Sequence, residues 1–191
     1  MELTLCLNYP DWLPEWLLSH SGCYPDPNTR MRLAIELSQL NIQHESGGPF
    51  GAAIFDLNSH TLIAAGTNRV VSCGASFAHA EIMAITAAQK KLGHFDLATN
   101  GLPRCELVSS CQPCAMCFGA IPWSGIRHVA CGARDSDARN IGFDEGPRHP
   151  DWIKALNNRN ISVDLDICRD EAVAILQAYV KKNGPIYNTD L

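Results

Sequence analysis

Long hydrophobic runs, clusters of positive charge and internal repeats are all missing from this chain of 191 residues. No apolar stretch approaches the roughly 18 residues that a membrane-spanning helix needs, so we expect no membrane span. Lysines and arginines number 15 against 20 aspartates and glutamates, which gives a formal net charge of −5. A general nucleic-acid binder needs clustered positive charge, so this balance argues against nucleic acid as a partner.

Charged residues are also few, at 18%, whereas apolar residues make up 46% of the chain. This composition excludes extended disorder and is typical of a globular protein with a sizeable core. We therefore expect one domain over residues 1–191, with an N-terminal arm over 1–25 and a C-terminal tail over 183–191 as a candidate lid. Because Trp12 and Trp16 would otherwise be exposed, we expect the arm to pack irregularly on the domain.

The first twenty residues contain no basic start and no small-residue cleavage site of the kind that marks secretion. Nine cysteines is a high and odd number, and without a secretion signal it does not predict a disulfide framework. The prediction is a cytoplasmic protein whose thiols are free or bound to metal.

The apolar pattern alternates between strands and helices. Short β-rich runs predict strands over 50–55, 61–70, 103–109, 126–131 and 161–166. Helical spacing predicts helices that start near residues 27, 79, 114, 152 and 169, with an ordered loop over 132–151. A hairpin followed by alternating helices and strands favours an α/β fold, namely a three-layer α/β/α arrangement with a mixed five-stranded sheet and helices on both faces.

Three candidate metal ligands lie at predicted helix starts. His79 begins one helix, and Cys114 and Cys117 lie in the first turn of another, where their i, i+3 spacing puts both sulfurs on one face. The positive end of a helix favours thiolates. Zinc accepts one histidine and two cysteines, and three protein ligands leave it the open position of a catalytic site. We expect one Zn²⁺ per chain.

Glu81 stands two residues after His79, close enough to reach that open position without binding the metal. It could take a proton from a zinc-activated water and pass it to a leaving amine. The alternative is a structural zinc site with Cys111 as fourth ligand, in a non-catalytic zinc-stabilised interaction domain. The cysteine spacing also resembles part of an iron–sulfur pattern, although a further cysteine at cluster spacing is missing.

Four segments carry a resemblance to a known family, namely Gly48-Pro49-Phe50-Gly51-Ala52, Thr67-Asn68-Arg69-Val70, His79-Ala80-Glu81 and Cys117-Phe118-Gly119-Ala120-Ile121. From about residue 30 to residue 166 the chain resembles the cytidine deaminase-like superfamily, in the branch that contains bacterial guanine deaminases and tRNA adenosine deaminases. A further segment, Ile141-Gly142-Phe143-Asp144-Glu145, is similar to the Gly-Phe-Asp-Asp segment of guanine deaminases, with Glu145 in place of the second aspartate, and it makes the resemblance closest to the bacterial guanine deaminases.

This resemblance implies hydrolysis of guanine at C2 to xanthine and ammonia, a reaction of purine catabolism. Guanine presents N1–H and a 2-amino group side by side, and Glu145 can accept from both. By the same resemblance Asn68 would hydrogen-bond the ring, and Phe50 and Trp123 would flank the flat heterocycle. The other candidate substrate contacts are Ala80, Asp144 and Tyr187. For the catalytic roles we nominate Glu81 and Glu145.

Each substrate contact also has a plain structural interpretation. Asn68 could be a turn residue, Phe50 and Trp123 could belong to the core, and Asp144 and Glu145 could lie in a solvated loop. Alternative activities are deamination of tRNA adenosine, an aminopterin or an s-triazine.

The resemblance further implies a homodimer, with a C-terminal segment that can be swapped and with Tyr187 closing the pocket. A frayed terminus is the alternative for that segment. The chain departs from the family pattern in the arm over 1–25 and in the segment over 147–152.

Overall fold

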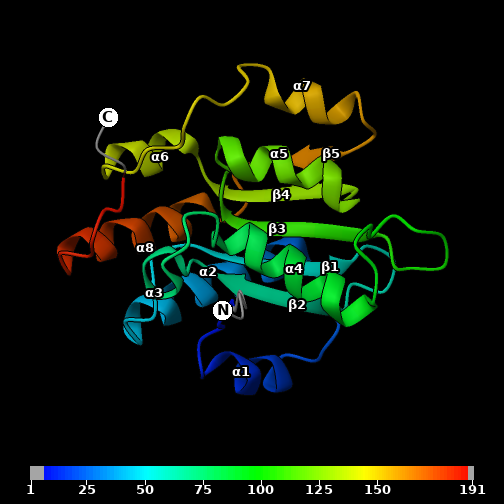
Figure 1. Cartoon of the computed structure of the whole chain (residues 1–191), viewed down its shortest axis with the longest axis horizontal. Helices are drawn as coiled ribbons and strands as arrows, with labels where there is room; N and C mark the ends of the chain where they lie inside the picture. Colours follow the sequence, from blue (N-terminus) through cyan, green and yellow to red (C-terminus); the bar gives the residue numbers. More distant parts are fainter. Residues whose placement is uncertain (1–6, 189–191) are drawn as a thin grey trace, which may run out of the picture.

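The computed structural model describes residues 7–188 and consists of one sheet between two layers of helices (Figure 1). The five strands run in the order β2-β1-β3-β4-β5. Strand β1 (Gly51–Asp56) pairs antiparallel with β2 (Leu62–Thr67) and with β3 (Cys105–Cys111). Strand β4 (His128–Ala133) pairs parallel with β3 and with β5 (Ser162–Asp164). The predicted mixed five-stranded sheet is confirmed.

Both faces of the sheet are covered because apolar residues occupy both sides of its central strands. Ala53 and Phe55 point into the core beneath α2 (Pro27–Gln43) and α8 (Arg169–Lys181). Ala52 and Ile54 point into the opposite core, formed with α4 (Ala80–Leu92), α5 (Ala115–Ser124) and α7 (Trp152–Asn157). This alternation with period two places α4 and α5 in front of the sheet and α2 behind it in Figure 1, which confirms the three-layer arrangement.

Helix starts follow the expected local chemistry. The Asp26 carboxylate accepts hydrogen bonds from the backbone N–H groups of Asn28 and Thr29, at 3.3 and 3.0 Å, and Pro27 fills the first turn of α2. The C-terminal ends of α4 and α5 are also predictable: the helices end at Gly93 and Gly125, whose φ angles of +73° and +81° favour glycine.

Three short helices lie outside the predicted elements. They are α1 (Leu13–Ser19), α3 (Val70–Cys73) and α6 (Asp135–Asn140). The arm was predicted to be irregular, but α1 forms there and buries Leu13 and Trp16 against the core on the α2 side. The prediction that the aromatic residues of the arm pack on the domain is confirmed for Trp16, while residues 1–6 lie outside the described residues.

A buried ionic chain crosses the end of the sheet that is remote from the helix starts of α4 and α5. The Arg30 guanidinium lies 2.7 Å from the Glu106 carboxylate, which in turn lies 2.9 Å from His128. Only 1% of the Glu106 side chain is exposed. Burial alone would raise the pKa of Glu106, but His128 and Arg30 outweigh it and lower the pKa below its ordinary value. The carboxylate is therefore charged and depends on these partners.

Replacing Arg30 with methionine should lower the free energy of unfolding by about 3–5 kcal/mol, because it removes one partner of a buried charge. The matched control is Arg32→Met, since Arg32 and Glu171 form a pair whose side chains are 56% and 48% exposed. Exposed pairs contribute about 0–1 kcal/mol. Urea unfolding measures both variants, and equal losses would contradict the assignment of Glu106 as a charge that needs its partner.

Candidate active site

The candidate metal-binding and catalytic residues converge on one edge of the sheet. Strands β2, β3 and β4 all end there and β1 starts there, since β2 runs antiparallel to β1 and β1 antiparallel to β3. The N-termini of α4 and α5 meet at the same edge. In α/β sheets, ligands bind outside the carboxyl ends of parallel strands, and this is the corresponding place here.

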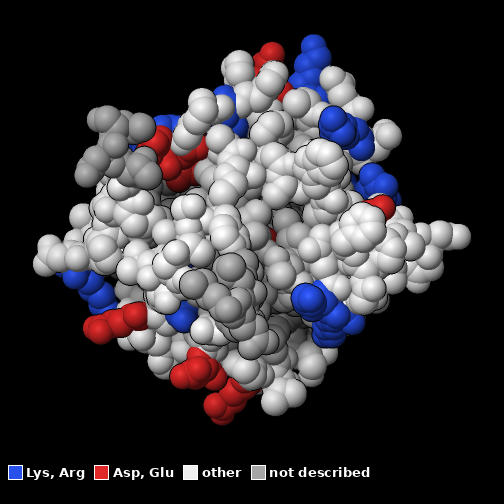
Figure 2. All heavy atoms as spheres, viewed as in Figure 1, with Lys and Arg blue, Asp and Glu red and all other residues white. Residues whose placement is uncertain are grey.

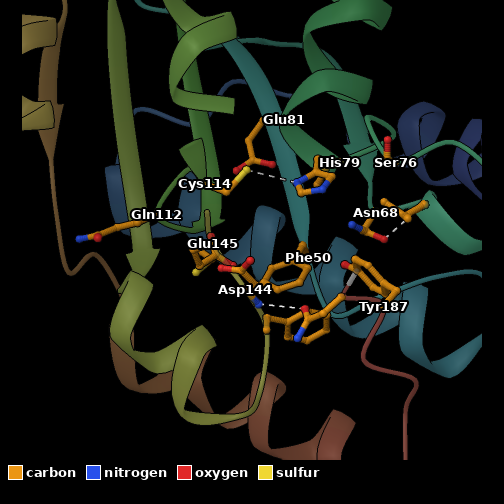
Figure 3. Close-up of a pocket in the computed structure, with 15 residues that line it drawn as sticks. Phe50, Asn68, Ser76, His79, Glu81, Gln112, Cys114, Asp144, Glu145 and Tyr187 are labelled. Atoms are coloured by element: carbon orange, nitrogen blue, oxygen red, sulfur yellow. Dashed lines mark hydrogen bonds between the residues drawn. The ribbon is translucent and has the colours of Figure 1, made fainter. Parts of the chain in front are cut away.

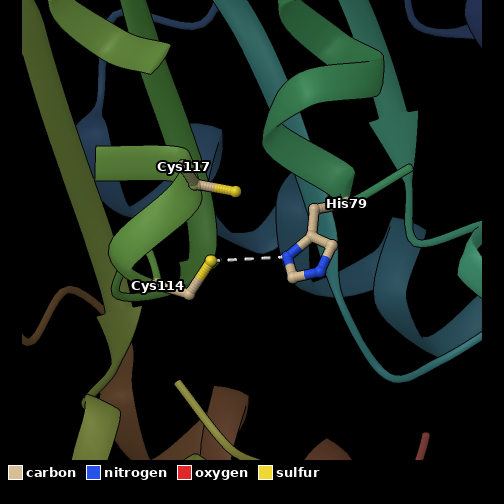
Figure 4. A group of neighbouring side chains, drawn as sticks. All are labelled: His79, Cys114 and Cys117. Carbon is tan, nitrogen blue, oxygen red and sulfur yellow. Dashed lines mark hydrogen bonds between the residues drawn. The ribbon is translucent and has the colours of Figure 1, made fainter. Parts of the chain in front are cut away.

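The predicted metal ligands are brought together at these helix starts (Figure 4). His79 and Cys114 are the residues immediately before α4 and α5, and Cys117 lies in the first turn of α5. Their ligand atoms all lie within 4.8 Å of one another, and Nδ1 of His79 is 3.5 Å from Sγ of Cys114. One imidazole nitrogen and two sulfurs at this spacing fit a zinc ion with an open position.

Cys111 does not belong to this group. Its thiol is directed to the backbone oxygen of Arg134, at 3.7 Å. The ligand cluster found among residues 7–188 contains His79, Cys114 and Cys117. The interpretation as a four-ligand structural zinc site with Cys111 therefore has no support in the geometry.

The local electrostatics favour a thiolate at this centre. Hydrogen bonding from Cys117 lowers the pKa of Cys114 to about 4, and His79 adds to the effect. A thiolate is the form of cysteine that binds metal. Because two thiols and an imidazole share this small space, a divalent cation is the partner that would stabilise all three together.

Glu81 and Glu145 are carboxyl groups held in the wall beside the ligand cluster (Figure 3). They are 6% and 7% exposed. Glu81 lies in the first turn of α4, and its Oε2 is 3.4 Å from Sγ of Cys117. Burial raises the pKa of Glu81, and burial together with the negative Cys114 raises the pKa of Glu145 to about 8. Buried carboxyl groups with raised pKa values in a cavity are candidates for a functional site.

The cavity between these groups has a volume of about 180 Å³. That is below the range of about 300–1,000 Å³ that is common for drug-sized ligands, so it suits a small planar molecule. The residues predicted from sequence that line it are Phe50, Asn68, His79, Ala80, Glu81, Cys114, Asp144, Glu145 and Tyr187. Cys117 is fully buried beside it.

Asn68 follows β2 and supplies an unpaired donor to this cavity. Its side chain is 1% exposed, and its Oδ1 accepts a hydrogen bond from the backbone N–H of Val70 at 3.3 Å. Its Nδ2 atom is buried without a partner among the described residues. Buried donors are normally paired, so this amide has the state expected of a group that pairs with a ligand.

The prediction for Trp123 is wrong in this structure. Trp123 is 84% exposed and does not line the cavity. The reason is geometric: α5 begins at the cavity with Cys114 and runs away from it, so that Trp123 lies near the far end of the helix. The aromatic wall is instead formed by Phe50, Phe143 and Tyr187.

Phe143 is the contact that the sequence analysis missed, although it lies in the segment that carried the resemblance. Its ring centroid lies 5.0 Å from the rings of both Phe50 and Tyr187, in edge-on arrangements. The other missed lining residues are Val70, Ser76, Cys111, Gln112 and Asn188. Phe143 and Val70 lie in segments quoted for the resemblance, and Cys111 and Gln112 directly precede Pro113 and the ligand Cys114. Ser76 and Asn188 carry no motif that would have identified them.

The C-terminal tail folds over the cavity of its own chain. Tyr179 in α8 donates a hydrogen bond to the backbone oxygen of Pro185 at 2.8 Å, which turns the chain back. Asn188 then bonds at two points with residues 141–146, called the acidic loop here: it accepts from the N–H of Asp144 at 2.9 Å and donates to the backbone oxygen of Gly142 at 2.7 Å. Tyr187 thereby reaches the cavity, as Figure 3 shows.

Gly48 makes room for that closure. A Cβ atom at this position would lie 2.8 Å from the hydroxyl oxygen of Tyr187 and 3.2 Å from Oδ1 of Asn68. The two pocket walls therefore meet at a position that accepts glycine alone without displacement of its neighbours.

Comparison with known proteins agrees with this geometry. The family described as the cytidine and deoxycytidylate deaminase zinc-binding region matches residues 26–133, more than half of the chain. The chain belongs to this family of zinc-dependent deaminases. It is an aminohydrolase with zinc as its cofactor.

Among the relatives of this deaminase, guanine deaminase of Bacillus subtilis is 36% identical over 133 residues, covering 70% of this chain and 81% of the relative. A probable cytosine deaminase of Schizosaccharomyces pombe is 36% identical over 131 residues, covering 69% and 73%. The solved structure of guanine deaminase from Nitrosomonas europaea is similar with a TM-score of 0.85 and 46% identity, covering 94% of this chain and 98% of the other.

Proposed function

We propose that this zinc aminohydrolase converts guanine and water to xanthine and ammonia. The observation that carries the proposal is a buried carboxyl group, Glu145, placed beside the ligand cluster in a cavity of about 180 Å³. Guanine offers N1–H and its 2-amino group as adjacent donors, and one carboxylate can accept both. The guanine deaminases among the relatives support the same substrate.

His79, Cys114 and Cys117 hold the metal in this proposal. Zinc bound there would supply a water whose pKa is lowered from 15.7 to about 7. Glu81 would accept the proton that this water loses and return it to the amine that leaves C2. Its position in the first turn of α4, next to but outside the ligand cluster, suits both transfers.

The other residues that line the cavity orient the substrate in this proposal. Glu145 accepts from the N1–H and 2-amino groups and so turns C2 toward the metal side. The unpaired Nδ2 donor of Asn68 meets an acceptor on the purine ring. Phe50, Phe143 and Tyr187 contact the ring edges and faces and exclude water.

An ammonia-release screen over free bases, nucleosides and amino-triazines tests the proposal. We expect guanine to be deaminated with the highest kcat/KM. Adenine should be slower by about 10⁴-fold, because it presents an acceptor at N1 and no 2-amino group to Glu145. If adenine, cytosine, a pterin or a triazine were turned over with a higher kcat/KM than guanine, the proposed substrate would be wrong.

A tRNA adenosine deaminase is the rival within the family, and several relatives bear that name. The surface argues against it. On the face drawn in Figure 2, lysines and arginines stand in small separate groups with uncharged surface between them. An RNA path needs a continuous basic surface. An anticodon stem-loop included in the screen at low salt decides between the two substrates.

A homodimer is also part of the proposal. The outer face of α5 carries Met116 and Trp123 with 38% and 84% of their surfaces exposed, and between them Gly119 has open space around the position of a Cβ atom. A helix without charged residues on its outer face is normally covered. Sedimentation equilibrium should give twice the chain mass, and a monomer would refute this part.

The family resemblance implied a tail that can be exchanged between subunits. In this structure the tail up to Asn188 lies over the cavity of its own chain, and residues 189–191 lie outside the described residues. We also propose that the whole chain forms one domain located in the cytoplasm. No helix in residues 7–188 has the length and apolar character to span a membrane. The described cysteines are all free, which suits a reducing compartment. Limited proteolysis and fractionation of cells test these two statements.

A further inference from the structure

Arg148 lies in the segment over 147–152, where the chain departs from the family pattern, and it bridges two parts of the active site. One guanidinium nitrogen donates to the backbone oxygen of Pro113 at 3.2 Å, and the other donates to Oε1 of Gln112 at 3.2 Å. Both acceptors immediately precede the zinc ligand Cys114. The guanidinium also stacks on the ring of Trp152, 4.8 Å from its centroid.

Asp135 connects this contact to the other end of the acidic loop. Its carboxylate lies 3.7 Å from Arg148 and accepts from Arg139 at 2.8 Å. Arg139 in turn donates to the backbone oxygen of Gly146 at 2.9 Å and lies 3.4 Å from the carboxylate of Asp144. The residues on either side of Glu145 are thus anchored through Arg139 to the Asp135 carboxylate at the start of α6, which Arg148 also approaches.

Glu145 itself is joined to α5 by a backbone hydrogen bond. Its carbonyl oxygen accepts from the N–H of Ala115 at 2.9 Å. Glu145 makes no side-chain hydrogen bond among the described residues, so the position of its carboxyl relative to Cys114 depends on how the backbone around it is held against α5. The Arg148 contacts to Gln112 and Pro113 add a second connection between the same two segments, three residues further along.

We propose that Arg148 is a positioning residue that fixes the Glu145 carboxyl at a set distance from the zinc ligand Cys114. The inference rests on the proposed function, since it assigns Glu145 to the substrate. Arginine suits the task because its planar fork donates to two acceptors while its face stacks on Trp152. A change in position of about 1 Å at a reacting group costs on the order of 10²-fold in rate.

Arg148→Met and Arg148→Lys test the role of the guanidinium. Methionine keeps an apolar stem without donors, and lysine keeps the charge without the planar fork. We expect about 10–100-fold lower kcat/KM for guanine with methionine and a smaller loss with lysine, at unchanged zinc content. The control is Arg159→Met, because Arg159 is exposed and makes no side-chain hydrogen bond within the described residues.

A double-mutant cycle then separates positioning of Glu145 from general support. All four proteins carry Glu81→Gln, so that no turnover interferes, and calorimetry measures the Kd of 8-azaguanine with Arg148→Met, with Glu145→Gln and with both. Arg148→Met should weaken binding about tenfold when Glu145 is present and have no further effect when it is replaced. If Arg148→Met does not fold, Arg148→Lys takes its place in the cycle.

Equal weakening in the two backgrounds would overturn the positioning role, because the effect of Arg148 would not pass through Glu145. So would unchanged kcat/KM in both Arg148 variants. An unsubstituted protein that fails to deaminate guanine would instead overturn the proposed function, and the role of Arg148 with it. An active protein with additive effects overturns the role of Arg148 alone.

Discussion

Replacement of Glu81 by glutamine is expected to lower kcat for guanine by about 10²–10⁴-fold, the usual contribution of a positioned general acid–base group. Glutamine keeps the size of the side chain, so the tightly packed wall around this 6%-exposed residue is preserved. What it removes is the ability to take a proton from water and return it to the departing amine. Ammonia release at saturating guanine measures the effect.

The interpretation requires that the variant keep its metal and its fold. Zinc content by atomic absorption and the melting temperature should match those of the unsubstituted protein, since Glu81 is not one of the ligands. Glu171→Gln makes the same chemical change at an exposed position on α8 and should leave kcat unaffected. If Glu81→Gln retained ammonia release with zinc bound, Glu81 would not be the proton shuttle.

The strands and long helices were predictable from the sequence because local and tertiary preferences agree in them. In β1, alternate residues face two different apolar layers, so the run Ala52 to Phe55 is apolar throughout, and it ends in the strand formers Ile54 and Phe55. Helix α2 starts where Asp26 and Pro27 predict it. The zinc ligands were equally accessible, because their spacing is dictated by the first turns of two helices.

The short helices were not predictable because they are held by tertiary contacts. Helix α1 has seven residues, too few to form by itself, and it is held by burial of Leu13 and Trp16. Helix α6 has six residues, and the Asp137 carboxylate at its start is paired with Arg169 from α8 at 2.8 Å. No local pattern reveals a partner that is 32 residues away.

The candidate site divides in the same way. The residues to which we assign chemical roles, His79, Glu81 and Glu145, lie in motifs and could therefore be named in advance. Residues that hold those groups lie elsewhere, as with Arg148, which contacts residues 35 and 36 positions earlier. The error for Trp123 has a related cause: nearness to Cys117 in sequence says nothing about the direction in which a helix leaves the cavity.

Replacement of Glu145 by glutamine is expected to lower kcat/KM for guanine by at least about 100-fold. The carboxylate would otherwise accept two hydrogen bonds, and bonds to a charged group contribute about 1.5–3 kcal/mol each. Glutamine keeps one acceptor oxygen and turns an amide N–H₂ toward a donor of the substrate. Asp144→Asn is the matched control, because it removes the same charge from the neighbouring residue, whose side chain is 42% exposed.

We expect Asp144→Asn to reduce kcat/KM less than tenfold, because solvent compensates for an exposed charge. Steady-state kinetics with guanine compare the two variants. Similar losses in both would mean that the loop as a whole needs negative charge, and that Glu145 has no separate contact with the substrate.

The pH dependence of the stability of the metal-free protein shows whether the lower kcat/KM of Glu145→Gln comes from a damaged fold. In the metal-free protein, burial together with Cys114 raises the pKa of Glu145 to about 8, so the metal-free fold favours the protonated carboxyl. A bound Zn²⁺ would add positive charge beside this group and so favour the carboxylate that accepts from guanine. The contribution of the protonated carboxyl to the stability of the metal-free protein is complete below the ordinary pKa of about 4.3 and is lost as the pH rises through 8. Glutamine cannot ionise, and urea unfolding of the zinc-free variant should therefore show a smaller loss of stability between pH 5 and pH 9 than the unsubstituted protein shows. A variant that is more stable at high pH and yet inactive has lost a contact with the substrate, because the fold that carries the contact remains intact.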